Sequence, residues 1–464
     1  MLNFEKHLDD IFESVKSNKT YKSNSMESIG NENILPEALQ KRAGTEMLQE
    51  DEHLNLPVGP QEEYALQREL RPFFNKRGIN SSKIGVPSKI IGLDYNNGES
   101  LNNHYACTFF FDIKGSTRLS LLYPLEEVFY YKNTIIQMCI EVIRSLDGHV
   151  HRIMGDAVMA FFVGSSGGDK ENAVADAINC AAVLKCMMDD SIVPWLEKKG
   201  YKPQDIGFRI GCDFGDNEQI IWGGFGYFGV GEISAAGLQV DMASKLQNQA
   251  DINEVMLGQT LLDFINWPDF YSKYKTETIN GIERDLDFLT PNLEDRLGKP
   301  IDYRMRQLNL NKYIEIISFP TSYRSGKSRG IIAHNHIQFK CEYKEEGEWL
   351  PLYSACEFLE KGIDLIFSVC VAKNSGLNFP LTAEFYKTNH GNDTPLNERG
   401  IRQYKGKRVI SQSRNPMTGV VSREEINVSI EEATSFRGLH TMECRISDAR
   451  GNPVFRDIIG VLIK

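Results

Sequence analysis

The hydrophobic positions between residues 105 and 260 follow the periods of strands and helices in turn. A buried strand is predicted from Tyr105, because the apolar and β-branched run beginning there stops abruptly at Asp112. Further helices are predicted at 125–146, 171–190 and 235–250, and further strands at 149–154, 157–163, 207–212, 219–224 and 255–258. This order of strand, helix, strand, strand, helix, strand predicts a ferredoxin-like α+β domain.

The two ends of the chain have different patterns. Residues 1–100 are polar and weakly patterned, with an amphipathic helix predicted over Leu2 to Val15 and a flexible link over Ser17 to Asn33. From Ile337 the apolar runs are strand-like and separated by Gly, Asn and Asp turns, which predicts an all-β sandwich. The chain is therefore divided into an N-terminal extension (1–100), an α+β domain (101–275), a linker (276–335) and a β-rich domain (336–464).

Composition narrows the classes of function. Of the 464 residues, 41% are hydrophobic and 25% are charged, as in ordinary soluble globular proteins. The net charge of −11 argues against sequence-independent binding to nucleic acid or to an anionic membrane. The N-terminus lacks the layout of a signal peptide, and the apolar runs are too short for a membrane span. The nine cysteines form no Cys-x-x-Cys pair, which indicates reduced thiols and a cytoplasmic protein.

Two acidic residues are the candidates for chemistry. Asp112 ends the first strand, and Asp156 follows Gly155 in the turn between two short strands that would neighbour it. Hard divalent cations are held by such carboxylates together with substrate phosphates. The turn Lys114-Gly-Ser-Thr117 can direct backbone N–H groups at phosphates. Each acid alone is an ordinary turn residue, but the combination predicts a metal-dependent nucleotide site.

Three segments carry a family resemblance. Phe109-Phe-Phe-Asp-Ile-Lys-Gly-Ser-Thr117, the Gly155-Asp156 hairpin and Gly237-Leu-Gln-Val-Asp-Met-Ala-Ser-Lys-Leu246 resemble the signature segments of class III nucleotidyl cyclases over roughly residues 105 to 260. The resemblance implies conversion of a nucleoside triphosphate to a 3′,5′-cyclic nucleotide and pyrophosphate. It also implies two Mn²⁺ or Mg²⁺ ions per site and a homodimer in which both subunits complete each active site.

Matching positions give the roles that the resemblance implies. The metal ligands would be Asp112, Asp156 and the carbonyl of Ile113, while Lys114, Gly115, Ser116 and Thr117 would bind the phosphates. The partner subunit would contribute Asp241 and Lys245, where the family usually has Asn and Arg. Lys keeps the charge without the planar fork of Arg, and Asp accepts a hydrogen bond but cannot donate one. These departures keep open a catalytically silent, regulatory cyclase-like domain.

The positions that would read the base also depart from the family. Arg152 stands where adenylyl cyclases have Lys and guanylyl cyclases have Glu, and Ser234 stands in place of their Asp or Cys. Arg only donates hydrogen bonds, which suits the ring acceptors of cytosine or uracil, and its length favours a one-ring base. CTP is the favoured substrate, with UTP as the alternative. An Arg paired with a neighbouring acid is the other interpretation of Arg152.

The C-terminal segment narrows the resemblance. Ser435-Phe-Arg-Gly-Leu-His-Thr-Met-Glu-Cys-Arg-Ile446 resembles the sensor domain of some bacterial nucleotidyl cyclases, and the whole layout resembles a pyrimidine cyclase of the Pycsar anti-phage systems. This implies a second messenger that activates a separate effector protein.

Three weaker hypotheses remain beside this one. A palm-type polymerising or diguanylate cyclase shares the fold and the acid pair but would carry a different hairpin sequence. His334-Asn-His336 has the residue order of a nuclease motif name, and the match is interpreted as a coincidence. A basic cluster is interpreted as a solvated face, with a phosphorylated ligand as the alternative; it comprises Arg399, Arg402, Lys405, Lys407, Arg408 and Arg414.

Overall fold

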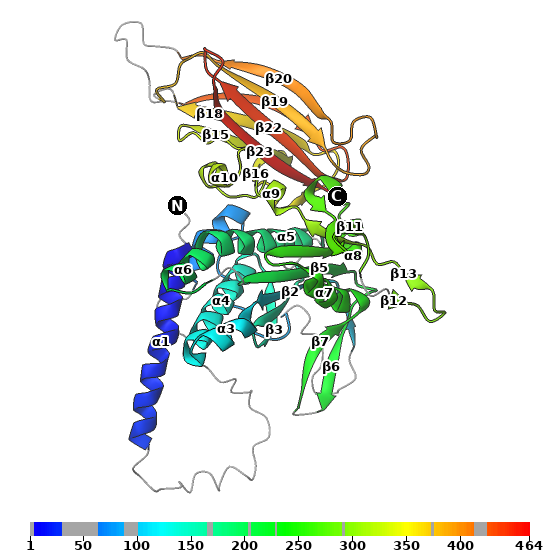
Figure 1. Ribbon diagram of the computed structural model, residues 1–464. Coiled ribbons are helices and arrows are strands. Elements are labelled where there is room, and N and C mark those ends of the chain that lie inside the picture. The colour runs from blue at the N-terminus through cyan, green and yellow to red at the C-terminus, as the bar shows by residue number, and fades with distance from the viewer. Residues whose placement is uncertain are drawn as a thin grey trace.

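The protein consists of an α+β body and a β-sandwich stacked on it (Figure 1). The computed structural model describes residues 4–29, 64–87, 101–164, 170–202, 206–227, 230–289, 293–372, 375–412 and 425–464. A first core of buried residues runs through the body into the base of the sandwich, and a second fills the space between the sandwich sheets.

The body is built on one seven-stranded sheet in the order β3-β4-β2-β5-β8-β14-β9, in which only β5 and β8 are parallel neighbours. The helices α4 (Leu125–Ser145) and α5 (Lys170–Met187) cover one face, where alternate residues of β2 such as Phe109 and Phe111 are buried. The strands are β2 (Ala106–Lys114), β3 (His149–Met154), β4 (Ala157–Phe162), β5 (Gly207–Gly215), β8 (Glu254–Gly258), β9 (Ser272–Lys273) and β14 (Met305–Leu308). The ferredoxin-like order predicted from the sequence is therefore confirmed.

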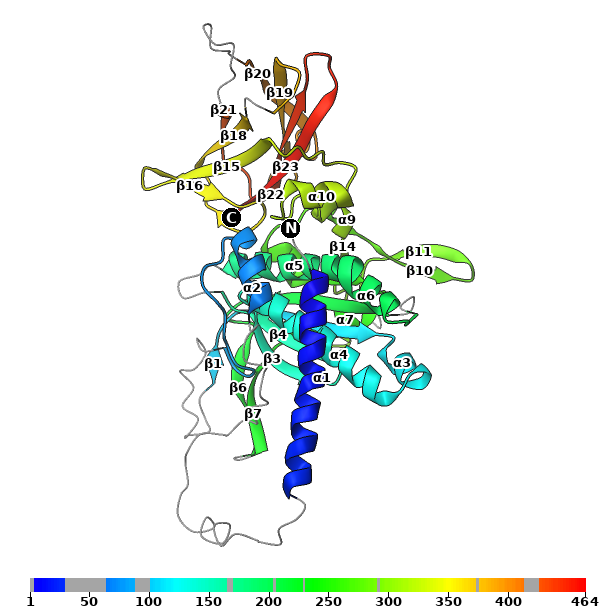
Figure 2. The same cartoon turned by 90° about the vertical axis from the view of Figure 1, so that its left-hand side faces the viewer.

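The opposite face of the sheet carries α7 (Leu238–Gln249) and a long β-ribbon. The ribbon consists of β6 (Ile221–Tyr227) and β7 (Val230–Ala236), with the short β1 (Asn102–Asn103) along its edge, and it projects from the body (Figure 2). The prediction that the helix begins at 235 is wrong by three residues. Its first positions are taken by β7, because Ala235 and Ala236 pair with Trp222 and Ile221.

The N-terminal extension packs on the body through α1 (Phe4–Ile29), α2 (Ala65–Leu70) and the 3₁₀ turn Arg71–Phe74. Phe12 of α1 stacks on Tyr131 at 5.2 Å and meets Trp195 edge-on at 5.1 Å between ring centroids. Arg71 donates to the carbonyls of Arg144 and Ser145 and so caps the C-terminus of α4. The predicted flexible link over 17–33 is wrong up to Ile29, since α1 continues to that residue; positions 30–33 lie outside the described residues.

The segment expected to be a linker contains elements of its own. These are β10 (Lys275–Ile279), β11 (Ile282–Leu286), β12 (Leu293–Glu294), β13 (Pro300–Ile301), β14, α9 (Leu310–Tyr313) and α10 (Thr321–Lys327). The strand β14 extends the central sheet by pairing with β8 and β9. Shorter helices of the body are α3 (Ser116–Leu122), α6 (Val193–Lys198) and α8 (Gln259–Phe264).

The C-terminal domain is a sandwich of two sheets, as predicted. One sheet has the order β16-β15-β18-β21 and the other the order β17-β23-β22-β19-β20. The strands are β15 (Ile337–Glu345), β16 (Glu348–Leu352), β17 (Phe358–Leu359), β18 (Asp364–Ala372), β19 (Leu381–Asn389), β20 (Arg402–Ile410), β21 (Glu425–Ala433), β22 (Gly438–Ser447) and β23 (Pro453–Ile463). Their alternating burial places Phe367, Phe385 and Cys444 in the core between the sheets.

Polar side chains of α5 join the sandwich to the body. The amide of Asn179 donates to the Ala355 carbonyl at 2.8 Å, and Asn172 accepts from the backbone N–H of Phe358 at 2.7 Å. Tyr313 in turn donates to Asn179 at 2.9 Å. Buried and directional contacts of this kind fix the orientation of the two domains.

Candidate active site

The two candidate metal ligands lie side by side at one edge of the central sheet. Asp112 is opposite Ala157 in the β2–β4 pairing, and Asp156 immediately precedes Ala157 in the β3–β4 hairpin. The backbone N–H of Ile113 donates to the carbonyl of Asp156 at 3.1 Å, which fixes the two acids relative to each other. The strand neighbours predicted from the sequence are therefore present.

The structure adds two residues that the sequence interpretation missed. Arg209 of β5 stands directly opposite Asp112, and its Nε and Nη2 atoms donate to Asp112 Oδ2 at 3.1 and 2.5 Å. Gln247 of α7 donates to the same oxygen at 3.3 Å. The signal for Arg209 was available, because an antiparallel register between the first strand and the strand starting at Gly207 places the two residues opposite each other.

The segment after Asp112 forms the turn that was predicted. Gly115 has a φ of 85°, in the left-handed region that favours glycine, and α3 begins at Ser116. The hydroxyl of the buried Ser116 donates to Asp156 Oδ2, so this turn is tied to the acid pair. Thr117 is exposed beside it, and Lys114 is half-buried at the end of β2. The backbone N–H groups of the first turn of a helix have no intrahelical acceptor and are available to an anion.

The chemistry of these residues fits a hard divalent cation. The carboxylates of Asp112 and Asp156 are held close together by the hydrogen bond between their backbone segments. Mg²⁺ and Mn²⁺ favour such oxygen ligands, and substrate and water supply the remaining ligands of the ion. The protein donors, Arg209, Gln247 and Ser116, all bond to the Oδ2 atom of the respective acid. Metal binding would replace these donors. Among the described residues, no group of three or more His, Cys, Asp or Glu side chains is placed to hold a metal ion.

The side chains of both residues predicted to recognise the base interact with other residues of the protein. Arg152, at the end of β3, forms an ion pair with Glu232 of β7. The alternative interpretation of Arg152 is thus realised in this state, although the pair is about two-fifths exposed and is weak for that reason.

Ser234 is held by a histidine. Its hydroxyl donates to Nε2 of His151 at 2.9 Å, while Nδ1 of that ring donates to the Gly85 carbonyl at 2.7 Å. Burial lowers the pKa of His151, which keeps the ring neutral and able to accept this bond. Sequence reasoning did not indicate His151 or Glu232, because neither belongs to a recognisable motif.

Asp241 and Lys245 lie on the exposed side of α7, while Ala243 and Gln247 face the sheet. The helix crosses β5 closely at Gly211, where an added Cβ would lie 2.2 Å from the Ala243 carbonyl oxygen and the Gln247 nitrogen. Within the described chain, no hydrogen bond or ion pair joins Asp241 or Lys245 to the acid pair, and both residues are exposed. The structure does not bring these four residues together in one subunit.

The weaker candidates receive little support. His334 Nδ1 accepts a hydrogen bond from the backbone N–H of His336 at 3.2 Å, and the two rings belong to no metal-type cluster in the described part of the chain. In the basic cluster, Arg402 is paired with Glu443 at 2.8 Å and Lys405 with Glu432 at 2.5 Å. Arg414 lies outside the described residues. Among the helices described, none is long and apolar enough to cross a membrane.

Comparison with known proteins identifies the family. Residues 309–464 match the model described as the Adenylyl/Guanylyl and SMODS C-terminal sensor domain. The chain is 38% identical over 405 residues to a cytidylate cyclase of Escherichia coli, covering 87% of this chain and 88% of the relative. A cytidylate cyclase of Staphylococcus aureus is 30% identical over 410 residues, covering 85% of this chain and 87% of the relative. The structure of the adenylyl cyclase CyaB from P. aeruginosa aligns with 45% of this chain and 95% of its own, at 17% identity and a TM-score of 0.36.

The ferredoxin-like sheet with adjacent carboxylates at a strand end is the arrangement expected of a nucleotidyl cyclase. The similarity to the two bacterial relatives extends over more than four-fifths of the sequence and includes both domains. The chain belongs to the cytidylate cyclase family.

Proposed function

We propose that this protein converts CTP to 3′,5′-cyclic CMP and pyrophosphate. The similarity to cytidylate cyclases over most of the chain carries this proposal. In the reaction the 3′-hydroxyl oxygen forms a bond to the α-phosphorus and loses its proton. The bond from that phosphorus to the bridging oxygen breaks in line, and pyrophosphate leaves.

Asp112, Asp156 and the carbonyl of Ile113 would hold the divalent cations, two Mn²⁺ or Mg²⁺ ions per site. When bound, these cations stabilise negative charge on the triphosphate. The N–H groups of the turn 114–117 orient the phosphates. Arg209, already beside Asp112, is placed to turn its guanidinium to a phosphate oxygen when that ion pair is exchanged.

The remaining groups select and position the nucleoside. Arg152 would leave Glu232 and donate to the ring acceptors of cytosine, with Ser234 at the edge of the same pocket. Asp241 accepts a hydrogen bond from the ribose, and Lys245 stabilises charge that develops at the phosphorus. The exposure of Asp241 and Lys245 on α7 supports their action on a second subunit of a homodimer.

The direct test incubates the purified chain with CTP, UTP, ATP and GTP and Mn²⁺, and separates the products by chromatography. Cyclic CMP is expected as the main product, and Asp112→Asn, which keeps the shape of the side chain, is expected to abolish it. Cyclic UMP as the main product would show that the substrate is UTP and not CTP. The absence of any cyclic nucleotide would indicate a silent regulatory domain and overturn the proposal.

Mixing inactive variants tests the shared active site. An equimolar mixture of Asp112→Ala and Lys245→Ala is expected to regain about one quarter of the wild-type activity, because half of the dimers are mixed and each has one intact site. Asp112→Ala mixed with Asp156→Ala is the control, since both residues belong to one subunit's half of the site and no intact site can form. Equal recovery in both mixtures would contradict a site built from two subunits.

The proposal has a cellular side, which rests on the resemblance to Pycsar cyclases. Cyclic CMP would serve in the cytoplasm as a signal of phage infection and activate a separate effector protein. The nine free cysteines, eight of them buried, suit a reducing compartment. Cells that carry the genes for this protein and its effector are expected to survive phage challenge better than cells with the Asp112→Asn variant, and equal survival would contradict the defensive role.

A further inference from the structure

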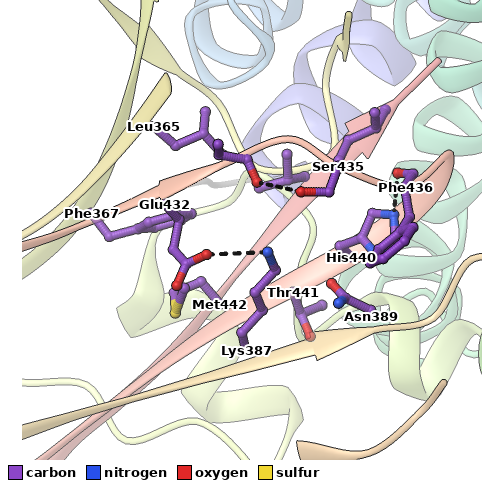
Figure 3. Close-up of a pocket in the computed structure, with 13 residues that line it drawn as sticks. Leu365, Phe367, Lys387, Asn389, Glu432, Ser435, Phe436, His440, Thr441 and Met442 are labelled. Atoms are coloured by element: carbon purple, nitrogen blue, oxygen red, sulfur yellow. Dashed lines mark hydrogen bonds and ion pairs between the residues drawn. The ribbon is translucent and has the colours of Figure 1, made fainter. Parts of the chain in front are cut away.

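The sandwich contains a cavity between its sheets, at the end that meets the cyclase body (Figure 3). Including its opening to solvent, it has about 340 Å³ of unoccupied space. Lys387 and Asn389 of β19 lie beside Met442 and His440 of β22 in the pairing register, and all four line the cavity. Apolar and polar side chains therefore meet on the same wall.

One buried polar group of the wall has unused hydrogen-bonding capacity, and a second polar group lies opposite it. His440 Nε2 donates to the carbonyl of Phe436 at 2.7 Å, so its Nδ1 is an acceptor, and this buried atom has no partner among the described residues. Asn389 is only 3% exposed and lies opposite His440 in the strand register, so its side-chain amide borders the same part of the cavity. Buried polar groups are normally satisfied, so such an exception points to a missing partner.

The charges around the cavity favour a neutral ligand. Lys387 is paired with Glu432 at 3.2 Å, and the other oxygen of that carboxylate is paired with Lys405 at 2.5 Å. An anion such as phosphate would have to disrupt this arrangement to gain a cation. The rings of Phe367 and Phe436 in the wall favour a flat ligand instead.

Entry of a ligand must move part of the wall. The enclosed space has room for about one water molecule, so a larger ligand has to displace a side chain such as Phe436. The next residue, Arg437, donates to the carbonyl of Phe264 at the end of α8 and accepts from Asn266 at 3.2 Å. Phe264 stacks on Phe214 of β5 at 4.0 Å between ring centroids. Arg437 and Phe264 thus connect the cavity wall to β5, the strand that carries Arg209.

We propose that this cavity binds a neutral nitrogen heterocycle of the nucleobase class, and that its entry shifts residues 434–437 against α8. The heterocycle donates an N–H to Nδ1 of His440 and exchanges hydrogen bonds with the amide of Asn389. Its plane packs against the aromatic wall.

Titration calorimetry of the full-length protein with cytosine, uracil, adenine and guanine tests the site, with inorganic phosphate as the anionic probe. At least one base is expected to bind, phosphate is not, and Asn389→Leu and His440→Phe each weaken binding about tenfold or more. Thr382→Val, seven residues earlier on β19, is the matched control and retains binding. Circular dichroism checks that the variants fold. No binding of any base, or binding that Asn389→Leu and His440→Phe leave intact, overturns the proposal.

Hydrogen exchange of residues 259–266 with and without the bound base tests the movement. The ligand is expected to change exchange of this segment in the wild type, while Arg437→Ala still binds the base and loses the change. Unchanged exchange at saturation shows that the cavity is not coupled to α8. Neither experiment measures cyclase activity, so failure here is distinct from failure of the proposed CTP reaction.

Discussion

Arg152 pairs with Glu232 in this structure, but the proposed function requires it to bind cytosine. If Arg152 reads cytosine, it must leave Glu232 when the substrate binds. Arg152→Ala is then expected to raise the KM for CTP about tenfold, as for loss of a charged hydrogen bond. Glu232→Gln, which frees the guanidinium at no cost in shape, is expected to lower that KM. Steady-state kinetics with CTP and ATP measure both, and an unchanged preference for CTP in Arg152→Ala would assign base selection elsewhere.

Arg209 was not a candidate in the sequence analysis, but in the structure it contacts the predicted metal ligand Asp112. Its Nε and Nη2 atoms both donate to Asp112, and the side chain is about one-fifth exposed. Arg209→Gln is expected to lower kcat/KM for CTP by tenfold or more, because Gln keeps a donor but loses the charge that balances the phosphates. Arg284→Gln, on the exposed β11 strand, is the control. Wild-type kinetics for Arg209→Gln would show that the ion pair is only structural.

Individual residues of the site could be predicted only where they belong to a sequence motif or lie opposite a motif residue on the neighbouring strand. The sequence pattern marks Asp112, which lies two residues before the end of β2, and Asp156, which lies in the β3–β4 hairpin, and the pairing of β2 with β4 confirms their proximity. Glu232 and His151 contact Arg152 and Ser234 through folding of the ribbon onto β3. These contacts depend on tertiary placement, which the periodicity of a segment does not contain.

At the scale of elements, the position of α7 depends on one glycine. A Cβ at Gly211 would lie 2.2 Å from backbone atoms of Ala243 and Gln247, and backbone cannot move aside as a flexible side chain can. Gly211→Ala is expected to destabilise the fold by about 1–3 kcal/mol and to detach Gln247 from Asp112. Gly224→Ala on β6 is the matched control, since its Cβ meets nothing within 4 Å. Thermal unfolding of both variants measures the difference, and equal stabilities would refute this account of the packing.

The periodic elements of the body were predicted well because each buries one face. The predicted strands at 149–154 and 157–163 correspond to β3 (His149–Met154) and β4 (Ala157–Phe162). The glycine-rich passage after Gly223 was not recognised as a ribbon, since its exposed residues lack the alternation of a half-buried strand. The helix of residues 4–29 was predicted too short for a similar reason, because polar residues after Val15 hide its continuation.

For the whole molecule, the sequence indicated two domains but not how they are joined. The sequence analysis assigned no role to the polar residues Asn172 and Asn179 on α5, and in the structure they hold the base of the sandwich. Residues 276–335 have short apolar runs without a period, yet β14 completes the central sheet. Long-range pairing of this kind is set by tertiary contacts and not by local pattern.

The junction of the two domains also has a pH-dependent contact. His390, in the sandwich, stacks on Phe270 of the body at 4.8 Å, and burial lowers its pKa to about 4. The unfolded chain takes up a proton below about pH 6.5, while the folded ring remains neutral until about pH 4. Stability from this residue is therefore complete above about pH 6.5 and is lost as the pH falls toward 4.

His390→Phe keeps the stacked ring and removes the titration. Between pH 7.5 and pH 5, the wild type is expected to lose about 2 kcal/mol more stability than this variant, because roughly one and a half pH units separate pH 5 from the unfolded pKa. Chemical denaturation of both proteins at the two pH values measures the difference. The other titratable groups are common to both proteins and cancel in the comparison. His440, whose charge acts on His390, is also neutral in the folded protein at pH 5, because burial lowers its pKa to about 4. Identical losses would mean that His390 is protonated within the folded junction.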